Sequence, residues 1–307
     1  MKTFFKTIKI AAGVFLMAAL AVSCLPEQQS LDGAGQTLVK LFPSEFSLVP
    51  LDAKTTAQTG VLFEVRRDAH NTEALNSATT VILDYSDAIL TKYNAANGKS
   101  FIPLPATLGT TDPAIVGGKI TLNFAAGEFT KLIKINVPNA STFDFSKQYG
   151  LGFKLTEVTG TGIKSAAAYD TVVAQVLVKN KYDGKYKMKG FIMRPGDTGG
   201  LEGYFKDHAK TLATAGATSV SMSPNQLWAN GGGVGGIGTW TFTVIESGTP
   251  PYAITVTDPV AVNWLMDPTY PNRYDPATKT FYFKVNWGAA TNPYTRGVTD
   301  TLVWSGN

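Results

Sequence analysis

Apolar and polar residues alternate with a period of two along most of this chain, in short runs separated by Gly, Pro, Asn and Asp. Val, Ile, Thr and aromatic residues dominate the runs, a pattern typical of strands that bury one face. One helix is expected after the N-cap residues Ser86 and Asp87, with its end at Asn97-Gly98. The sequence therefore predicts an all-β fold class.

The chain has 307 residues, more than one ordinary domain needs. Asp183-Gly184 is a turn signal between two expected strands, and we place the domain boundary there. Residues 36–182 are expected to form an N-terminal Ig-like β-sandwich, and residues 183–307 a second β-sandwich or a barrel-like antiparallel β domain. The expected strands are residues 61–65, 79–84, 119–124, 131–137, 149–155 and 170–179 in the first domain, and 185–193, 219–222, 239–245, 252–257, 280–287 and 299–304 in the second.

Residues 1–23 have the features of a lipoprotein signal peptide. Three lysines precede an apolar run at residues 10–21, and Ala21-Val22-Ser23 leads to Cys24, the only cysteine of the chain. The apolar run is shorter than the roughly 20 residues of a spanning helix. We therefore expect lipidation of Cys24, a tether at residues 24–35, and no disulfide within the chain.

Charge and ligand chemistry exclude several classes of function. Without the three leader lysines, 24 basic residues face 23 acidic ones, so no basic stripe for nucleic acid is expected. His70 and His208 have no partners at metal spacing, and we expect neither a metal nor a cofactor. The G-x-G-x-x-G sequence at residues 233–238 precedes a strand pattern instead of a helix, so it does not predict a dinucleotide site.

Several motifs of the first domain resemble those of a known family. They are Tyr93-Asn94, Gly98, the stretch at residues 101–105, Gly127-Glu128 and the run at residues 178–186. Together they resemble an N-terminal β-sandwich domain of unknown function from lipoproteins of glycan-foraging Gram-negative bacteria. The resemblance implies a surface glycan-binding lipoprotein with an all-β C-terminal partner domain. Residues 25–29 contain a single acidic residue, so display on the outer face of the membrane stays open.

All five tryptophans lie in the second domain. Trp228 and Trp264 fall in two long loops, residues 224–238 and 259–276, close to amide and charged residues. An indole face can stack on a sugar ring while polar neighbours bind its hydroxyls. We therefore predict glycan binding by Trp228, Trp264, Tyr270 and Arg273. The alternative is that each indole closes the edge of the core beneath its loop.

These observations favour an outer-membrane lipoprotein that binds a polysaccharide or oligosaccharide without cleaving it. Its expected partners are the glycan, the membrane through the lipid, and other outer-membrane glycan-uptake proteins. The first alternative is a structural or adhesive surface protein that binds a protein partner. The second is a glycoside hydrolase, which is disfavoured because no catalytic barrel of about 250 residues fits beside the first domain. We expect no enzyme.

Overall fold

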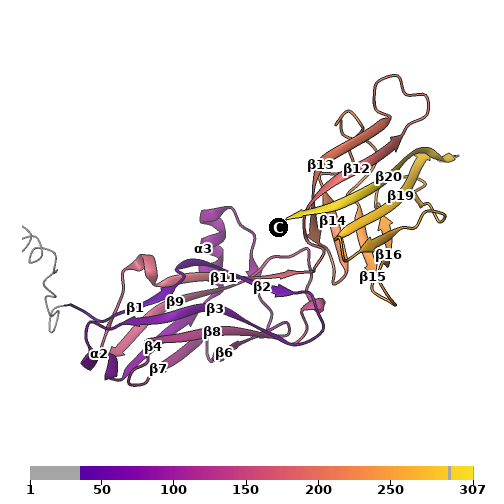
Figure 1. The fold of residues 1–307 in the computed structure, drawn as a ribbon. Coiled ribbons are helices and arrows are strands. Elements are labelled where there is room, and N and C mark those ends of the chain that lie inside the picture. Colours follow the sequence, from indigo (N-terminus) through magenta and orange to yellow (C-terminus); the bar gives the residue numbers. More distant parts are fainter. Residues whose placement is uncertain (1–34, 290–291, 307) are drawn as a thin grey trace, which may run out of the picture.

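The computed structural model of the protein describes residues 35–289 and 292–306 (Figure 1). Residues 1–34, with the expected leader and Cys24, lie outside the described residues. Strands make up most of the described chain, which confirms the all-β fold class. The helical elements are α2 (Thr72–Asn76), α3 (Asp87–Asn97) and two 3-10 turns, Ala140–Thr142 and Ala167–Tyr169.

The first domain is a sandwich of two sheets. One sheet has the strand order β10-β1-β3-β8-β6, and the other has the order β2-β11-β9-β4-β7, with β5 beside β9. Apolar side chains of both sheets share one core, in which the Phe63 ring lies 5.1 Å from the Phe153 ring of the facing sheet. The strands are β1 (Leu38–Phe42), β2 (Glu45–Asp52), β3 (Gln58–Asp68), β4 (Thr79–Tyr85), β5 (Ile102–Pro103), β6 (Thr110–Asp112), β7 (Lys119–Phe124), β8 (Thr130–Val137), β9 (Tyr149–Gly160), β10 (Ile163–Lys164) and β11 (Thr171–Lys179).

All six strands expected in this domain are present, and the sequence analysis missed β2 as well as shorter strands. Pro50 interrupts the apolar run of β2, and a proline argues against a central strand because it lacks an N–H group. The structure resolves this conflict because β2 lies at the edge of its sheet, paired in parallel with β11 on one side only. An edge strand tolerates the missing donor.

The expected helix is confirmed at both ends. The Ser86 side chain accepts a hydrogen bond from the backbone N–H of Ala88, and Gly98 ends α3 in the left-handed conformation. The helix packs closely on β9, because a Cβ atom at Gly150 would lie 2.9 Å from Leu90 and one at Gly152 would lie 2.8 Å from Ile89. Two glycines in a strand thus make room for a helix on the sheet.

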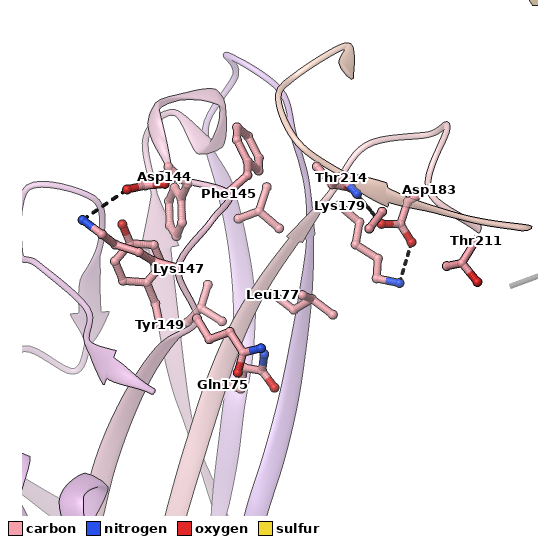
Figure 2. A pocket seen from close by; sticks show the side chains of 15 residues that line it. Asp144, Phe145, Lys147, Tyr149, Gln175, Leu177, Lys179, Asp183, Thr211 and Thr214 are labelled. Carbon is pink, nitrogen blue, oxygen red and sulfur yellow. Dashed lines mark hydrogen bonds and ion pairs between the residues drawn. The ribbon is translucent and has the colours of Figure 1, made fainter. Parts of the chain in front are cut away.

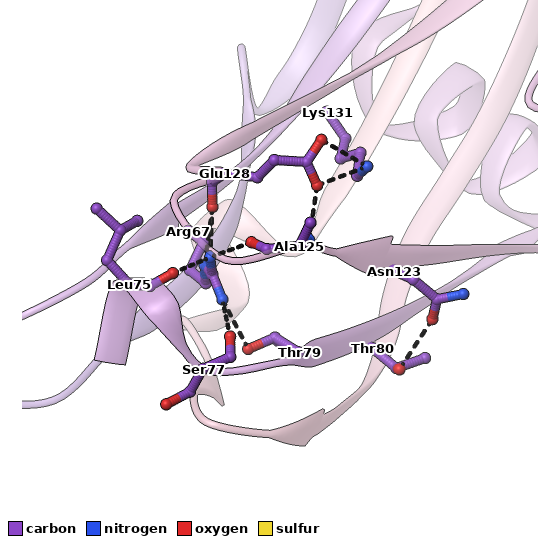
Figure 3. Close-up of polar contacts among 9 residues, drawn as sticks. All are labelled: Arg67, Leu75, Ser77, Thr79, Thr80, Asn123, Ala125, Glu128 and Lys131. Atoms are coloured by element: carbon purple, nitrogen blue, oxygen red, sulfur yellow. Dashed lines mark hydrogen bonds and ion pairs between the residues drawn. The ribbon is translucent and has the colours of Figure 1, made fainter. Parts of the chain in front are cut away.

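A buried arginine fastens one end of the sandwich (Figure 3). Arg67 is 1% exposed, and its guanidinium donates hydrogen bonds to backbone carbonyls and one hydroxyl. The acceptors are the carbonyl oxygens of Leu75, Ser77, Ala125 and Glu128 and the Oγ1 atom of Thr79. Burial lowers the pKa of Arg67, and the charge of Glu128 partly offsets that effect. The arginine therefore joins β3, β4, the end of α2 and the turn before β8.

The second domain is a barrel, one of the two architectures expected. Its sheet has the order β17-β19-β18-β16-β15-β14-β13-β12-β20, and pairing of β19 with β20 closes it into eight strands. The strands expected from the sequence are present, whereas β13 was missed and β17 and β18 lie inside a segment expected to be a loop. The strands are β12 (Gly184–Met193), β13 (Gly203–Thr214), β14 (Ser219–Ser223), β15 (Thr241–Ile245), β16 (Tyr252–Thr257), β17 (Leu265–Met266), β18 (Arg273–Asp275), β19 (Thr280–Ala289) and β20 (Asn292–Gly306).

The segment between the two domains is short and hydrogen-bonded to the barrel. The Asp183 carboxylate accepts from the Lys179 Nζ atom at 2.7 Å and from the backbone N–H of Thr214 at 2.8 Å. The Nδ2 atom of Asn180 donates to the carbonyl oxygens of Gly216 and Ser219. The loop between β12 and β13 lies at the other end of the barrel, away from the first domain (Figure 1). We call this the distal end.

Candidate functional site

The glycine-rich loop at residues 224–238 folds over the distal opening of the barrel. Within it, the backbone N–H of Trp228 donates to the Gly232 carbonyl at 2.7 Å. Trp228, Val234 and Ile237 are each 7–8% exposed and belong to the barrel core. The loop therefore closes the barrel with its own apolar side chains.

A single carboxylate fastens this loop to the segment after β16. The Asp258 side chain accepts hydrogen bonds from the backbone N–H groups of Gly238, Val260 and Ala261. It also accepts from the Nε1 atom of Trp240 at 2.9 Å, a residue that is fully buried. One half-buried acceptor thus orders both loops that the sequence analysis singled out.

The two loop tryptophans are covered by the fold and do not form open stacking platforms. Trp228 is 7% exposed. Trp264 is half-buried, donates its Nε1–H to the Val256 carbonyl, and has its ring 5.1 Å from the Trp240 ring. Both indoles pack against the barrel core, as in the alternative that the sequence left open. The tertiary structure buries these indoles, because the loops fold inward over the barrel opening.

The other two expected site residues lie elsewhere. Arg273 faces Tyr282 across the β18–β19 pair, with its guanidinium carbon 4.2 Å from the centre of the tyrosine ring. Tyr282 alternates with the buried Phe281 and Phe283, so this pair lies on the outer face of the barrel. Tyr270 is half-buried in the loop before β18. The four expected residues therefore divide between the core and the outer face.

An aromatic pair that the sequence analysis missed lies on the outer face near the distal end. Tyr204 is 86% exposed, and its ring lies 4.9 Å from the Phe191 ring across the β12–β13 pair. The signal was present in the sequence, since Phe191 continues the series Lys185, Lys187, Lys189 on the solvent face of its strand. An apolar residue in that series puts an aromatic ring on the solvent side of the strand, where Phe191 is half-buried.

Two arginines lie at the end of the same strands. The guanidinium carbon of Arg194 is 5.0 Å from the Trp228 ring centre, and that of Arg296 is 5.9 Å from it. Arg194 directly follows β12, and Arg296 is on β20, which pairs with β12 up to the Met193–Gly297 pair. Both arginines therefore lie at the rim of the barrel, over the tryptophan that closes it.

The barrel interior also holds two ionisable groups beneath the loop. The Nζ atom of Lys210 donates to the carbonyl oxygens of Pro224 and Asn225 and so holds the start of the loop. Burial lowers the pKa of Lys210 to about 8, and the charge of Asp300 opposes that shift. Burial also raises the pKa of Asp300 well above its usual range. We assign these groups to the fold, since they lie inside the barrel wall.

A cleft of about 340 Å³ lies where the two domains meet (Figure 2). Its charged side chains largely pair with one another: Lys147 with Asp144, and Lys179 with Asp183. Gln175 and Leu177 line the side formed by the first domain, and Thr211 lines the side formed by the barrel. Three aromatic residues also line the cleft, but Phe143 and Tyr149 are buried and Phe145 is half-buried. The cleft therefore offers amides and hydroxyls without an exposed aromatic ring, and it ranks below the distal end as a stacking site.

The described residues contain no cluster of His, Cys, Asp and Glu that would hold a metal ion. His70 accepts or donates a hydrogen bond with Thr37 at 2.9 Å, and His208 stacks on Phe205. No helix in the described part of the chain is both long and apolar enough to cross a bilayer.

Comparisons with known proteins give one family-model match, which lies within the first domain. A family model described as a "-like, N-terminal domain" matches residues 42–162, which confirms the resemblance stated above. No curated protein sequence matches the chain.

Solved structures share the two-domain fold at low sequence identity. A protein of unknown function from Bacteroides ovatus is 13% identical, with a TM-score of 0.53 over 88% of this chain and 95% of that one. A multidomain protein including DUF1735, also from Bacteroides ovatus, is 12% identical, with a TM-score of 0.50 over 87% and 93%. A structure described as an auxiliary nutrient binding protein from Bacteroides thetaiotaomicron is 13% identical, with a TM-score of 0.46 over 84% and 89%. The two Bacteroides ovatus structures, with TM-scores of 0.53 and 0.50, show the fold alone.

Proposed function

We propose that the protein binds a glycan without cleaving it, at the distal end of the barrel. The observation that carries the proposal is the exposed Tyr204 ring beside Phe191. Tyr204 is 86% exposed, so its ring keeps a face free for the apolar side of a sugar. The half-buried Phe191 ring extends this aromatic surface, and exposed aromatic patches of this kind often mark binding sites.

The surrounding outer face supplies polar partners for sugar hydroxyls. In the strand register, Phe191 lies opposite Thr299, and Thr299 lies opposite Lys284 on β19. The next outward row contains Lys189, Thr301, Tyr282 and Arg273. Stacking surfaces with a few placed polar groups are typical of small-ligand sites. Arg273 thus stays part of the proposed site, whereas Trp228 and Trp264 pack against the barrel core.

We further propose that Cys24 carries lipid and anchors the protein to the outer membrane. A membrane-held array gains avidity, because several weak sugar contacts act together. Cys24→Ser should leave the protein unlabelled by radioactive palmitate and move it from the membrane fraction to the soluble fraction. Unchanged labelling and fractionation of this variant would contradict the anchor.

The glycan-binding proposal is tested with Tyr204→Ala and the double variant Phe191→Ala/Tyr204→Ala on a polysaccharide panel. Affinity gel electrophoresis should show at least about a tenfold loss of affinity, equal to about 1.4 kcal/mol. Tyr169→Ala is the matched control, because Tyr169 is a 48% exposed tyrosine in the first domain. Equal retardation of all three variants and the parent by a bound polysaccharide would contradict this site.

A further inference from the structure

We propose that the distal end selects acidic glycans, through a carboxylate or sulfate group held by Arg194 and Arg296. This inference rests on the proposed function and specifies the substrate class of the same end of the barrel. It depends on a difference among the arginines: some use their side-chain donors within the protein, and the two at the rim of the barrel do not.

The chain has five arginines, and three of them direct their side-chain N–H groups to acceptors. Arg66 donates to the Glu64 carboxylate at 2.8 Å, and Arg67 donates to five buried oxygen atoms. Arg273 donates to the Pro271 carbonyl. Among the residues that the structure describes, none accepts a hydrogen bond or forms an ion pair with the side chain of Arg194 or Arg296. The two rim arginines therefore keep their donors available.

Both of these arginines lie over the same indole. The ring of Trp228 attracts each guanidinium, and such a cation–π contact uses none of the N–H hydrogen-bond donors. Two like charges near one ring also repel each other, and an anion between them removes that repulsion. Carboxylate and sulfate oxygens fit the planar fork of an arginine with two parallel hydrogen bonds.

The nearby acidic side chains are occupied by the backbone of the β12–β13 loop. Asp197 accepts from the backbone N–H groups of Gly199, Leu201 and Glu202, and these bonds outweigh burial and lower its pKa. The charge of Arg194 contributes to that shift without a direct ion pair. Glu202 accepts from the backbone N–H of Arg194 at 2.6 Å. Neither carboxylate therefore serves as the partner of the guanidinium groups.

A third donor at this end also lacks an acceptor. Trp287 is the cross-strand partner of Arg296, and its buried Nε1–H has no acceptor within the described part of the chain. Trp287 thus adds one unpaired donor beside Arg296, although at 2% exposure it lies beneath the rim and not on it.

The rim and the aromatic pair are close enough to serve one ligand. Phe191 lies three residues before Arg194 in the chain, and three residues of extended strand span about 10 Å. The Phe191 partner on β20 is Thr299, three residues after Arg296. A glycan chain stacked on Tyr204 and Phe191 would therefore reach the arginines with its next acidic group.

The test compares acidic polysaccharides with chemically matched neutral ones. The probes are polygalacturonate and its carboxyl-reduced form, and chondroitin sulfate and its desulfated, carboxyl-reduced form. The variants are Arg194→Gln, Arg296→Gln and the double variant. Arg66→Gln is the matched control, because Arg66 also lies over an aromatic ring, that of Phe42, but is far from the barrel in the first domain.

We expect at least one acidic probe to bind at least tenfold more tightly than its neutral counterpart. The double variant should lose that preference, and raising sodium chloride from about 0.05 to 0.5 M should weaken binding of the parent more than of the variant. Arg66→Gln should bind like the parent. Urea unfolding followed by tryptophan fluorescence shows whether each variant keeps a folded barrel.

Three outcomes would overturn the inference. Equal binding of acidic and neutral probes, lost in Tyr204→Ala, would remove the acidic preference and leave the proposed function intact. Undiminished binding of the acidic probe by a folded double variant would assign the preference to other residues. No binding of any probe in the full panel, acidic or neutral, would refute both this inference and the proposed function.

Discussion

Replacement of Arg67 by Met should destabilise the first domain by about 4 kcal/mol and leave the second domain unchanged. Methionine fills much of the volume of the arginine stem but offers no hydrogen-bond donor. Arg67 is 1% exposed, so water cannot easily replace the lost bonds. The acceptors that would lose their donor are the carbonyl oxygens of Leu75, Ser77, Ala125 and Glu128 (Figure 3).

The magnitude follows from two opposing effects. A buried acceptor that loses its partner costs about 1–3 kcal/mol, so four carbonyls together cost about 4–12 kcal/mol. Removing a buried charge returns several kcal/mol of desolvation free energy, and the 1% exposure of Arg67 shows that its charge lies out of water. The returned desolvation free energy offsets the upper part of the roughly 4–12 kcal/mol cost, and a net loss of about 4 kcal/mol of stability remains.

The assay separates the two domains by their chromophores. All five tryptophans lie at residues 228–304, so tryptophan fluorescence follows the barrel, whereas far-ultraviolet circular dichroism follows both domains during urea unfolding. Arg67→Met should shift the dichroism transition of the first domain and leave the fluorescence midpoint in place. The control is Arg66→Met, whose ion pair with Glu64 is partly exposed and contributes about 0–1 kcal/mol. An Arg67→Met midpoint equal to that of Arg66→Met would refute the reasoning.

Three further predictions concern the barrel, each measured by urea unfolding with tryptophan fluorescence. Lys210 has a folded-state pKa of about 8, below that of the unfolded chain, so the free energy of unfolding of the barrel should rise from pH 8 to 9.5. Lys210→Met should flatten that rise. A parent protein whose stability does not rise over this range would contradict the assignment. Asp258→Asn should cost about 2 kcal/mol, because an amide N–H₂ would face N–H groups that now donate to the carboxylate. An unchanged unfolding midpoint would show that these hydrogen bonds are dispensable. Gly190→Ala should cost about 2 kcal/mol, since a Cβ atom would lie 2.2 Å from the Thr299 carbonyl oxygen. Gly235→Ala should cost less, since Gly235 has open space around it and no left-handed backbone conformation.

Local signals in the sequence were sufficient where neighbouring residues decide the structure. Ser86 and Gly98 fix the ends of α3 through bonds to residues within one helical turn. Alternation predicted six strands of the first domain because each strand buries every second side chain in the same core. The sequence analysis missed β13 because the alternation of buried and exposed residues is broken in this strand. Asp207 adopts a left-handed conformation there, near the register shift beside Met188.

The site depends on contacts between distant parts of the chain. Arg194 and Arg296 are brought to one indole by the pairing of β12 with β20, which links the two ends of the barrel sheet. Phe191 and Tyr204 meet through the β12–β13 register. A sequence pattern can place Phe191 on the solvent face of its strand, but it cannot supply the neighbour across the sheet.

The sequence by itself determined the all-β class, the capped helix and the strands that alternate cleanly, because those depend on spacing and on neighbouring residues. It also placed every tryptophan in the second half of the chain. Only the tertiary structure decided that the sheet closes through β19 and β20 and that the loop of Trp228 folds over the opening. Burial of an indole in a loop is set by what the loop covers, so Trp228 closes the core while Tyr204 stays in water.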